Sequence, residues 1–156
     1  MGQITELRLP ADRSHVIVAK RAASALASVA GFDVEAVADL TIAVAQACEN
    51  AIQCLERTGA LAGQVRMTFR LEDKSLEVTV RSAISRDAEL AARARVAEGM
   101  REREAQRAGR RELTLQDAAS TDLALRLMGL FVDDHSYRLD ERTGGLRVRL
   151  TKYRAS

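Results

Sequence analysis

The sequence predicts a two-layer sandwich of the α+β class, with helices on one face of a mixed, mainly antiparallel sheet. Two hairpin patterns, three amphipathic helix patterns and their order along the chain carry this prediction. The order is strand, helix, helix, hairpin, charged insertion, helix, hairpin. The chain has 156 residues, which fits one domain with a core of its own. We therefore expect a single domain over residues 1–156.

The chain opens with a predicted strand and a predicted helix. Residues 4–9 alternate apolar and polar side chains, which is typical of a half-buried strand, and Pro10 ends it. Asp12 or Ser14 can cap the helix that follows, and Gly31 is a natural stop for it. Its apolar positions recur at helical spacing and are Val16, Ala19, Ala23, Leu26 and Ala30.

The second helix has the strongest periodic pattern in the chain. Asp33 is a good N-cap for it, and Glu35 falls in its first turn. One continuous apolar stripe follows, made of Val37, Leu40, Thr41, Val44, Ala47, Cys48, Ala51 and Leu55. Gly59 and Gly63 bound the loop after this helix.

Two hairpins supply the other predicted strands. Residues 65–71 and 76–80 alternate apolar and polar types, which predicts one buried and one solvated face. The last hairpin turns at residues 142–145. Its apolar positions are His135, Tyr137 and Leu139 before the turn, and Leu146, Val148 and Leu150 after it.

A charged insertion and a third helix lie between the hairpins. Residues 86–112 contain eight Arg and six acidic residues, with Ala as the main apolar type. This composition favours an exposed helix, and we expect a lid-like helical insertion over residues 86–119. Ser120 or Thr121 can cap the third helix. We expect its buried face to consist of Leu123, Leu127, Leu130 and Phe131.

Composition excludes several classes of function. The chain carries 24 basic and 22 acidic residues, a net charge of +2, and only five aromatic residues. We therefore expect no nucleic-acid partner, since such proteins concentrate basic and stacking residues. No apolar run is long enough to span a bilayer, and the N-terminus lacks the apolar core of a signal peptide. We expect a cytoplasmic protein without a membrane partner.

The cysteines and histidines do not predict a metal site. On one helix, Cys48 and Cys54 would lie about 9 Å apart along the axis, which is too far for a disulfide. We expect buried, reduced thiols. His15 and His135 are isolated, and no Cys/His cluster has zinc-ligand spacing.

Three amide side chains share one face of the second helix. Gln46, Asn50 and Gln53 follow one another at spacings of four and three residues. They form either the solvated face of a helix or a site in which an Asn oxygen faces a pocket and binds a hard cation such as Mg²⁺. The pattern alone leaves both alternatives open.

Residues 39–52 resemble the N-box helix of the anti-sigma-factor serine kinases, the RsbW type within the GHKL superfamily of Bergerat-fold ATPases. The motif there is an acidic residue followed by Leu, then Ala-Val, then Ala and Asn-Ala. Residues 32–33, 127–133 and 148–153 are also similar to family segments. The resemblance covers roughly residues 3–82 and 120–153.

The resemblance implies roles for individual residues. Asn50 would bind the Mg²⁺ on the ATP phosphates, and Gln46 occupies the position of the family's general base. An amide cannot accept the proton, so Gln46 removes that function. Ser82 occupies the approximate position of the Asp with which the family binds adenine. Ile84 stands where the family has a glycine.

The second glycine box corresponds to Asp122-Leu123-Ala124. Asp122 would repel phosphate from the helix N-terminus that normally attracts it. We therefore expect weakened binding of ATP or ADP with Mg²⁺, and impaired phosphoryl transfer. Glu49 points away from the Asn50 face and is no substitute base.

Three functions follow from these observations. The first is an anti-sigma-like regulator of transcription and stress response, homodimeric, which binds a sigma factor, a STAS-domain anti-anti-sigma protein, or both. The second is an active serine/threonine kinase that uses Mg-ATP to phosphorylate a STAS-domain protein. The third is a nucleotide-independent scaffold or phosphotransfer protein, for which His15 is the candidate histidine.

Overall fold

A computed structural model describes residues 2–58, 63–83, 122–139 and 145–156 of the chain. The elements in chain order are β1 (Gln3–Pro10), the short 3-10 turn η1 (Arg13–His15), α1 (Val16–Val29), α2 (Val34–Thr58), β2 (Gln64–Leu71), β3 (Ser75–Ala83), a helix over residues 122–128, β4 (Asp134–Leu139) and β5 (Leu146–Tyr153). The predicted insertion over 86–119, Ser120, Thr121, Ile84, Gly59 and residues 142–144 lie outside the described residues.

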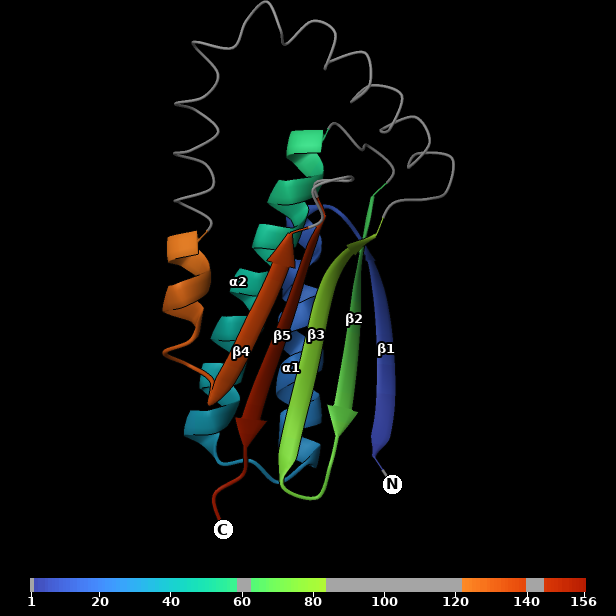
Figure 1. Cartoon of the computed structure of the whole chain (residues 1–156). Helices are drawn as coiled ribbons and strands as arrows, with labels where there is room; N and C mark the ends of the chain where they lie inside the picture. Colours follow the sequence, from blue (N-terminus) through green and yellow to red (C-terminus); the bar gives the residue numbers. More distant parts are fainter. Residues whose placement is uncertain (1, 59–62, 84–121, 140–144) are drawn as a thin grey trace, which may run out of the picture.

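The described strands form one five-stranded sheet in the order β1-β2-β3-β5-β4. Each neighbouring pair is antiparallel. Figure 1 shows α1 and α2 on one side of this sheet, and the helix over 122–128 on the same side. The predicted two-layer α+β sandwich is therefore confirmed.

Small side chains let the helices lie close to one another and to the sheet. Ala19, Ala23 and Ala27 of α1 are fully buried, so α1 meets α2 through methyl groups. The sheet supplies the larger core residues, including Phe69 of β2. Alternate positions of β2, β3 and β5 are buried, as the sequence predicts: Val65, Met67, Phe69, Leu76, Val78, Val80, Leu146, Val148 and Leu150.

The helix boundaries follow the predicted capping residues. The Asp33 carboxylate accepts a hydrogen bond from the Ala36 backbone N–H at 2.8 Å, which caps the start of α2. Asp12 accepts one from the Ser14 N–H at 2.9 Å and caps η1. Gly31 has φ +78° and reverses the chain between α1 and α2, a conformation that favours glycine.

The predicted buried face of the third helix is wrong. Leu125 and Met128 are buried there, with Val132 just beyond the helix, whereas Leu123, Leu127 and Leu130 are exposed. Phe131 is partly buried against the core. The predicted and the observed sets of apolar residues both fit helical spacing. Contact with the core, and not the number of leucines, therefore determines which set is buried.

Three strand positions also differ from the prediction. Ile4 is exposed because it faces the outer side of β1, whereas Leu7 and Leu9 face the core. In β4, Tyr137 and Leu139 pair with the buried Val148 and Leu146 but stay exposed. β4 is the last strand of the sheet, and its inward face is only partly covered.

Candidate functional site

The candidate site is centred on Asn50 in the second half of α2. Asn50 is 4% exposed and is the only buried polar residue in the described part of the chain. Gln46 and Gln53 are half-buried, while Glu49 is exposed. The solvated-face interpretation of Asn50 is therefore wrong, because its flank of α2 is covered. The pocket interpretation of this residue remains.

Asn50 and Gln46 form an amide pair. The Gln46 side-chain Nε2 donates a hydrogen bond of 3.3 Å to the Asn50 Oδ1. The Asn50 Nδ2 is buried and has no hydrogen-bond partner. A buried donor without a partner costs about 1–3 kcal/mol. Asn50 therefore holds unused hydrogen-bonding capacity in the interior.

This pair limits how a metal could bind. Mg²⁺ takes oxygen ligands, and it is usually held by few protein groups together with substrate phosphates. The Asn50 amide offers one such oxygen, which now accepts from Gln46. No group of three or more His, Cys, Asp or Glu residues that could hold a metal occurs within the described ranges. The residues fit a phosphate-bound Mg²⁺ with a single protein ligand, and they form no metal site of their own.

Ser82 lies beside Asn50 in the fold and serves as a structural link. Its hydroxyl donates to the Ala51 backbone carbonyl of α2 at 2.9 Å and accepts from the Leu146 N–H of β5 at 3.2 Å. The structure thus brings the ends of β3 and β5 to the residue after Asn50. With its hydroxyl proton donated to α2, Ser82 lacks the carboxylate that could accept a hydrogen bond from an adenine amino group.

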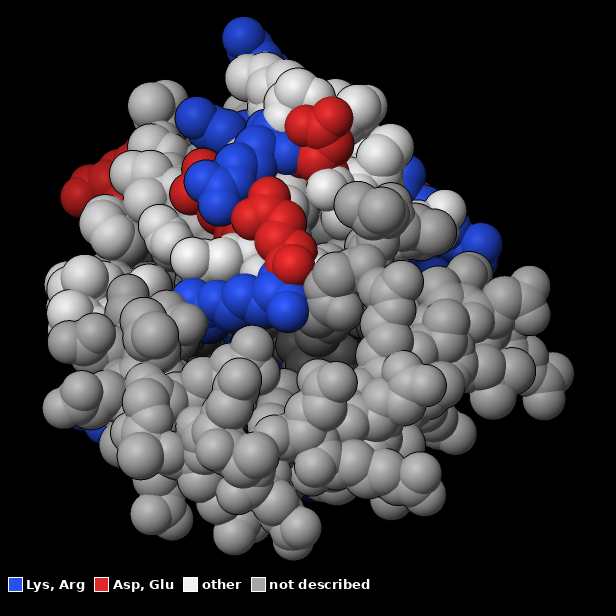
Figure 2. Space-filling view, turned by 90° about the horizontal axis from the view of Figure 1, so that it is seen from above, with Lys and Arg blue, Asp and Glu red and all other residues white. Residues whose placement is uncertain are grey.

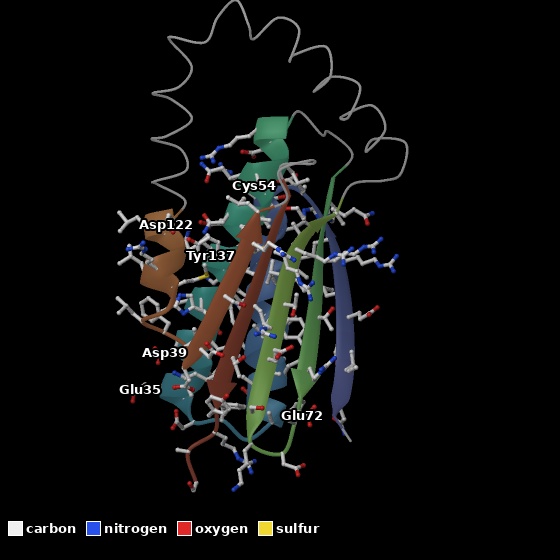
Figure 3. All side chains as sticks on the ribbon, viewed as in Figure 1. Glu35, Asp39, Cys54, Glu72, Asp122 and Tyr137 are labelled. Carbon is white, nitrogen blue, oxygen red and sulfur yellow. The ribbon has the colours of Figure 1, made fainter. Side chains whose placement is uncertain are left out.

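Asp122 lies in a different local network. Its carboxylate accepts a hydrogen bond from the Tyr137 hydroxyl and forms an ion pair of 2.9 Å with Arg126. Figure 3 shows Asp122 and Tyr137 next to each other, between the helix over 122–128 and β4. The hydrogen bond to Asp122 raises the pKa of Tyr137. Ala124, the third residue of the predicted glycine box, is half-buried.

The charges around the end of α2 are mixed in sign. In Figure 2, which views this end of the molecule, basic and acidic side chains of the described residues lie next to one another. A site that binds several phosphates usually concentrates positive charge. The described charged side chains in this view are of both signs.

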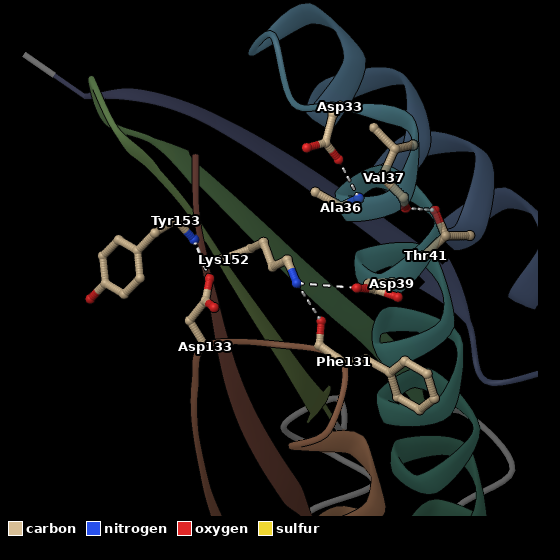
Figure 4. A network of polar contacts seen from close by, with 9 residues as sticks. All are labelled: Asp33, Ala36, Val37, Asp39, Thr41, Phe131, Asp133, Lys152 and Tyr153. Carbon is tan, nitrogen blue, oxygen red and sulfur yellow. Dashed lines mark hydrogen bonds and ion pairs between the residues drawn. The ribbon is translucent and has the colours of Figure 1, made fainter. Parts of the chain in front are cut away.

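A second polar network was not predicted from the sequence. Lys152 Nζ forms an ion pair with Asp39 Oδ2 at 3.3 Å and donates to the Phe131 carbonyl at 3.1 Å (Figure 4). It joins α2, β5 and the turn before β4. The sequence contains one signal for this network. Lys152 follows Leu146, Val148 and Leu150 at every second position of β5, so it is expected on the inward face of the strand. A lysine at an inward position needs a buried partner.

A pocket of about 340 Å³ adjoins this second network. Asp33, Glu35, Asp39, Lys152 and Arg154 contribute its charged lining together with Asp133. Asp39 precedes Asn50 by eleven residues, which is about 16 Å along a helix axis. The pocket is therefore separate from the candidate nucleotide site.

The cysteines are confirmed as free and buried. Burial raises the pKa of Cys48 to about 11, with the nearby Glu49 carboxylate acting in the same direction. Burial also raises the pKa of Cys54. Both thiols are therefore protonated at neutral pH, which makes them poor nucleophiles. Among the described residues, no helix combines the length and apolar character that crossing a bilayer requires.

Comparison with known proteins adds a family to this geometry. A family model described as the histidine kinase-like ATPase domain matches residues 9–152. A serine-protein kinase RsbW of Bacillus licheniformis is 32% identical over 75 residues, which is 48% of this chain and 47% of the relative. One of Listeria innocua is 35% identical over 74 residues, 47% of this chain and 46% of the relative. The chain spans about half the length of these relatives.

The family match extends from the end of β1 to the end of β5 and therefore includes α2 with Gln46 and Asn50. It agrees with an antiparallel sheet that is covered on one face by helices. The chain belongs to the histidine kinase-like ATPase domain family, within the GHKL superfamily.

Proposed function

We propose that this chain is an anti-sigma-type regulator that acts by binding a sigma factor, a STAS-domain anti-anti-sigma protein, or both. In this proposal residues 1–156 form one domain, the protein is a homodimer, and phosphoryl transfer is not its main activity. The family match and the similarity to serine-protein kinases RsbW support the regulatory class.

One observation supports the proposed absence of phosphoryl transfer. Gln46, at the position of the family's general base, is an amide that donates to the Asn50 oxygen. It cannot accept a proton from a substrate hydroxyl, and its hydrogen bond occupies one of the two lone pairs of the Asn50 oxygen. The two residues that the resemblance assigns to catalysis and Mg²⁺ binding therefore engage each other.

Weak nucleotide binding is compatible with this proposal. When bound, ATP would supply phosphate oxygens for Mg²⁺, and Asn50 would add one amide oxygen after both amides turn. Ser82 would help to shape the adenine side, and Asp122 would disfavour phosphate at its helix unless Arg126 offsets its charge. Ile84 and Ala124 stand at the other positions that the resemblance assigns to nucleotide contacts.

The binding function is tested by capture from the native host. A tagged copy of the full chain is expected to retain a sigma factor or a STAS-domain protein, which mass spectrometry identifies. Purified partner and chain are then mixed and analysed by size-exclusion chromatography. A stable complex that forms without nucleotide supports the proposal. The absence of any complex with either partner class contradicts it.

An active serine kinase is the second candidate function. The buried, unpartnered Nδ2 of Asn50 favours it, because this donor is free to meet a ligand oxygen. Mg-ATP at a hundred times its dissociation constant is expected to stabilise a kinase by about 2.7 kcal/mol. Thermal unfolding with millimolar Mg-ATP, compared between the natural chain and Asn50→Ala, measures this effect. No shift in either protein would exclude the kinase.

A further inference from the structure

The sheet face opposite the helices carries five arginines in one row, one from each strand. The strand register pairs Arg8 with Arg66, and Arg66 with Arg81. It then pairs Arg81 with Arg147, and Arg147 with Arg138. Directly paired residues project on the same face, and strands lie about 4.8 Å apart, so the row crosses roughly 19 Å. We call these five residues the arginine row.

The arginine row points away from the core. Its strand neighbours Met67, Val80 and Val148 are buried on the helix side, and side chains alternate between the two faces. Four row arginines are exposed, and Arg66 is half-buried. In Figure 1 the described helices lie behind the sheet, so no described helix covers the row.

The positive charge of the row is not compensated within the described part of the chain. None of the five side chains forms an ion pair or a hydrogen bond there, and the Nε of Arg66 is buried without a partner. Like charges directly opposite each other destabilise a sheet. A face that only has to be solvated would be more stable with alternating signs.

The rest of the same face is mixed in charge. Two further rows of this face contain Arg70 and Arg149 together with Glu6, Glu77 and Asp134. The whole chain has a net charge of only +2. The charge is therefore concentrated in one narrow line across the strands, and it is not spread over the face.

We propose that the arginine row is a docking surface for an acidic α-helix of a protein partner, which lies across the five strands. A helix advances 5.4 Å per turn, close to the roughly 4.8 Å between strands. One carboxylate per turn can thus meet one arginine per strand. Guanidinium groups pair with carboxylates through two parallel hydrogen bonds, which adds specificity to the attraction.

The same face is poorly suited to a nucleic acid. Among the paired outward positions the only aromatic residue is Tyr153, which lies six residues along β5 from Arg147, about 20 Å from the row. Bases that follow the row therefore have nothing on which to stack. Glu6 and Glu77 beside the row would repel phosphates on a wider polyanion. The inference goes beyond the proposed function, since it concerns the face of the sheet opposite Asn50 and holds whichever protein supplies the helix.

The test uses a synthetic helix as the probe and the full chain as the receptor. The probe is an alanine-rich peptide of about 18 residues, roughly 27 Å long, with one glutamate per turn on a single face. A control peptide has the same composition, with its glutamates distributed around the helix. Fluorescence anisotropy is expected to show tighter binding of the one-faced peptide. Binding should weaken from about 0.1 M to 1 M salt, as charges become screened.

Matched variants test whether the one-faced peptide binds at the arginine row. Arg81→Gln with Arg147→Gln removes two row charges, whereas Arg70→Gln with Arg149→Gln removes two charges of the same face outside the row. The first pair is expected to weaken binding about 10-fold and the second less than about 2-fold. The first pair should unfold at the same temperature as the natural chain or higher, because repulsion is relieved.

Four results would overturn the proposal: no binding, equal binding of both peptides, equal losses in both variant pairs, or a single-stranded oligonucleotide that binds more tightly with the same dependence on the row. If the first variant pair does not fold, the single changes Arg138→Gln and Arg149→Gln provide the same comparison. Arg138→Gln must then be the weaker binder, and equal affinities would contradict the proposal.

Discussion

Asn50 shows how a single residue links this fold to its family. The sequence pattern locates it on α2 and suggests a ligand role, but the pattern is equally consistent with a solvated face. Burial distinguishes the two, and burial depends on what packs beside α2. Leu125 and Met128 from the helix over 122–128 join the same core, and no local pattern predicts that contact.

The unpartnered donor of Asn50 predicts a stability cost. Asn50→Leu removes a buried polar group and fills a similar volume, so the free energy of unfolding is expected to rise by about 1 kcal/mol. Urea unfolding of the ligand-free protein measures this change. Any stabilisation by Mg-ATP should disappear in the same variant. A lower stability of Asn50→Leu would contradict the assignment of the Asn50 Nδ2 as a donor without a partner. Gln53→Leu, at a half-buried position of the same helix, serves as the control.

Cys48 predicts a pH dependence at the alkaline end. An unperturbed thiol titrates near 9, and burial raises the pKa of Cys48 to about 11 in the folded chain. The unfolded chain therefore loses its proton first, so the contribution of Cys48 is complete below pH 9 and is lost as the pH rises to 11. Urea unfolding at pH 8 and pH 10.5 should show a larger loss of stability in the natural chain than in Cys48→Ala. Equal losses would contradict the buried thiol.

At the scale of elements, the sequence predicts the helix starts better than the helix faces. Asp33 and Gly31 act locally, through one hydrogen bond and one backbone conformation, so their effects can be predicted from neighbours in sequence. The ion pair between Asp39 and Lys152 joins residues far apart in the chain. Its only sequence signal is a lysine at an inward strand position.

This ion pair should couple α2 to β5 measurably. Lys152 and Asp39 side chains are 15% and 30% exposed, whereas the Arg13–Glu56 pair is 64% and 51% exposed at a similar distance. A double-mutant cycle with Asp39→Asn and Lys152→Met is expected to give a coupling of about 1 kcal/mol. The same cycle at Arg13 and Glu56 should give roughly 0–0.5 kcal/mol. Equal couplings would show that the partly buried pair has no special role.

At the scale of the whole molecule, the order of elements predicts the fold. Strand, helix, helix, hairpin, helix and hairpin allow few compact arrangements of the two-layer type, and the structure adopts one of them. The arginine row could not be predicted in this way. Arg8 and Arg138 lie far apart in the sequence, and only the register across all five strands aligns them.

The candidate site was only partly predictable for the same reason. Gln46 and Asn50 are four residues apart on one helix, so helix geometry brings them together. Ser82 meets Ala51 only through the packing of β3 on α2. Asp122 pairs with Arg126 and Tyr137, and the latter contact depends on the place of β4 at the sheet edge. Local contacts can be derived from spacing, whereas contacts across layers require the structure.

We propose that this member of the ATPase family acts through protein contact and not through phosphoryl transfer. The most direct test is to incubate the chain and its captured STAS-domain or sigma-factor partner with radiolabelled Mg-ATP and measure the phosphate transferred to the partner. We expect a stable complex and no transfer above the level of an Asn50→Ala control. Stoichiometric phosphorylation of the partner, abolished by Asn50→Ala, would contradict it.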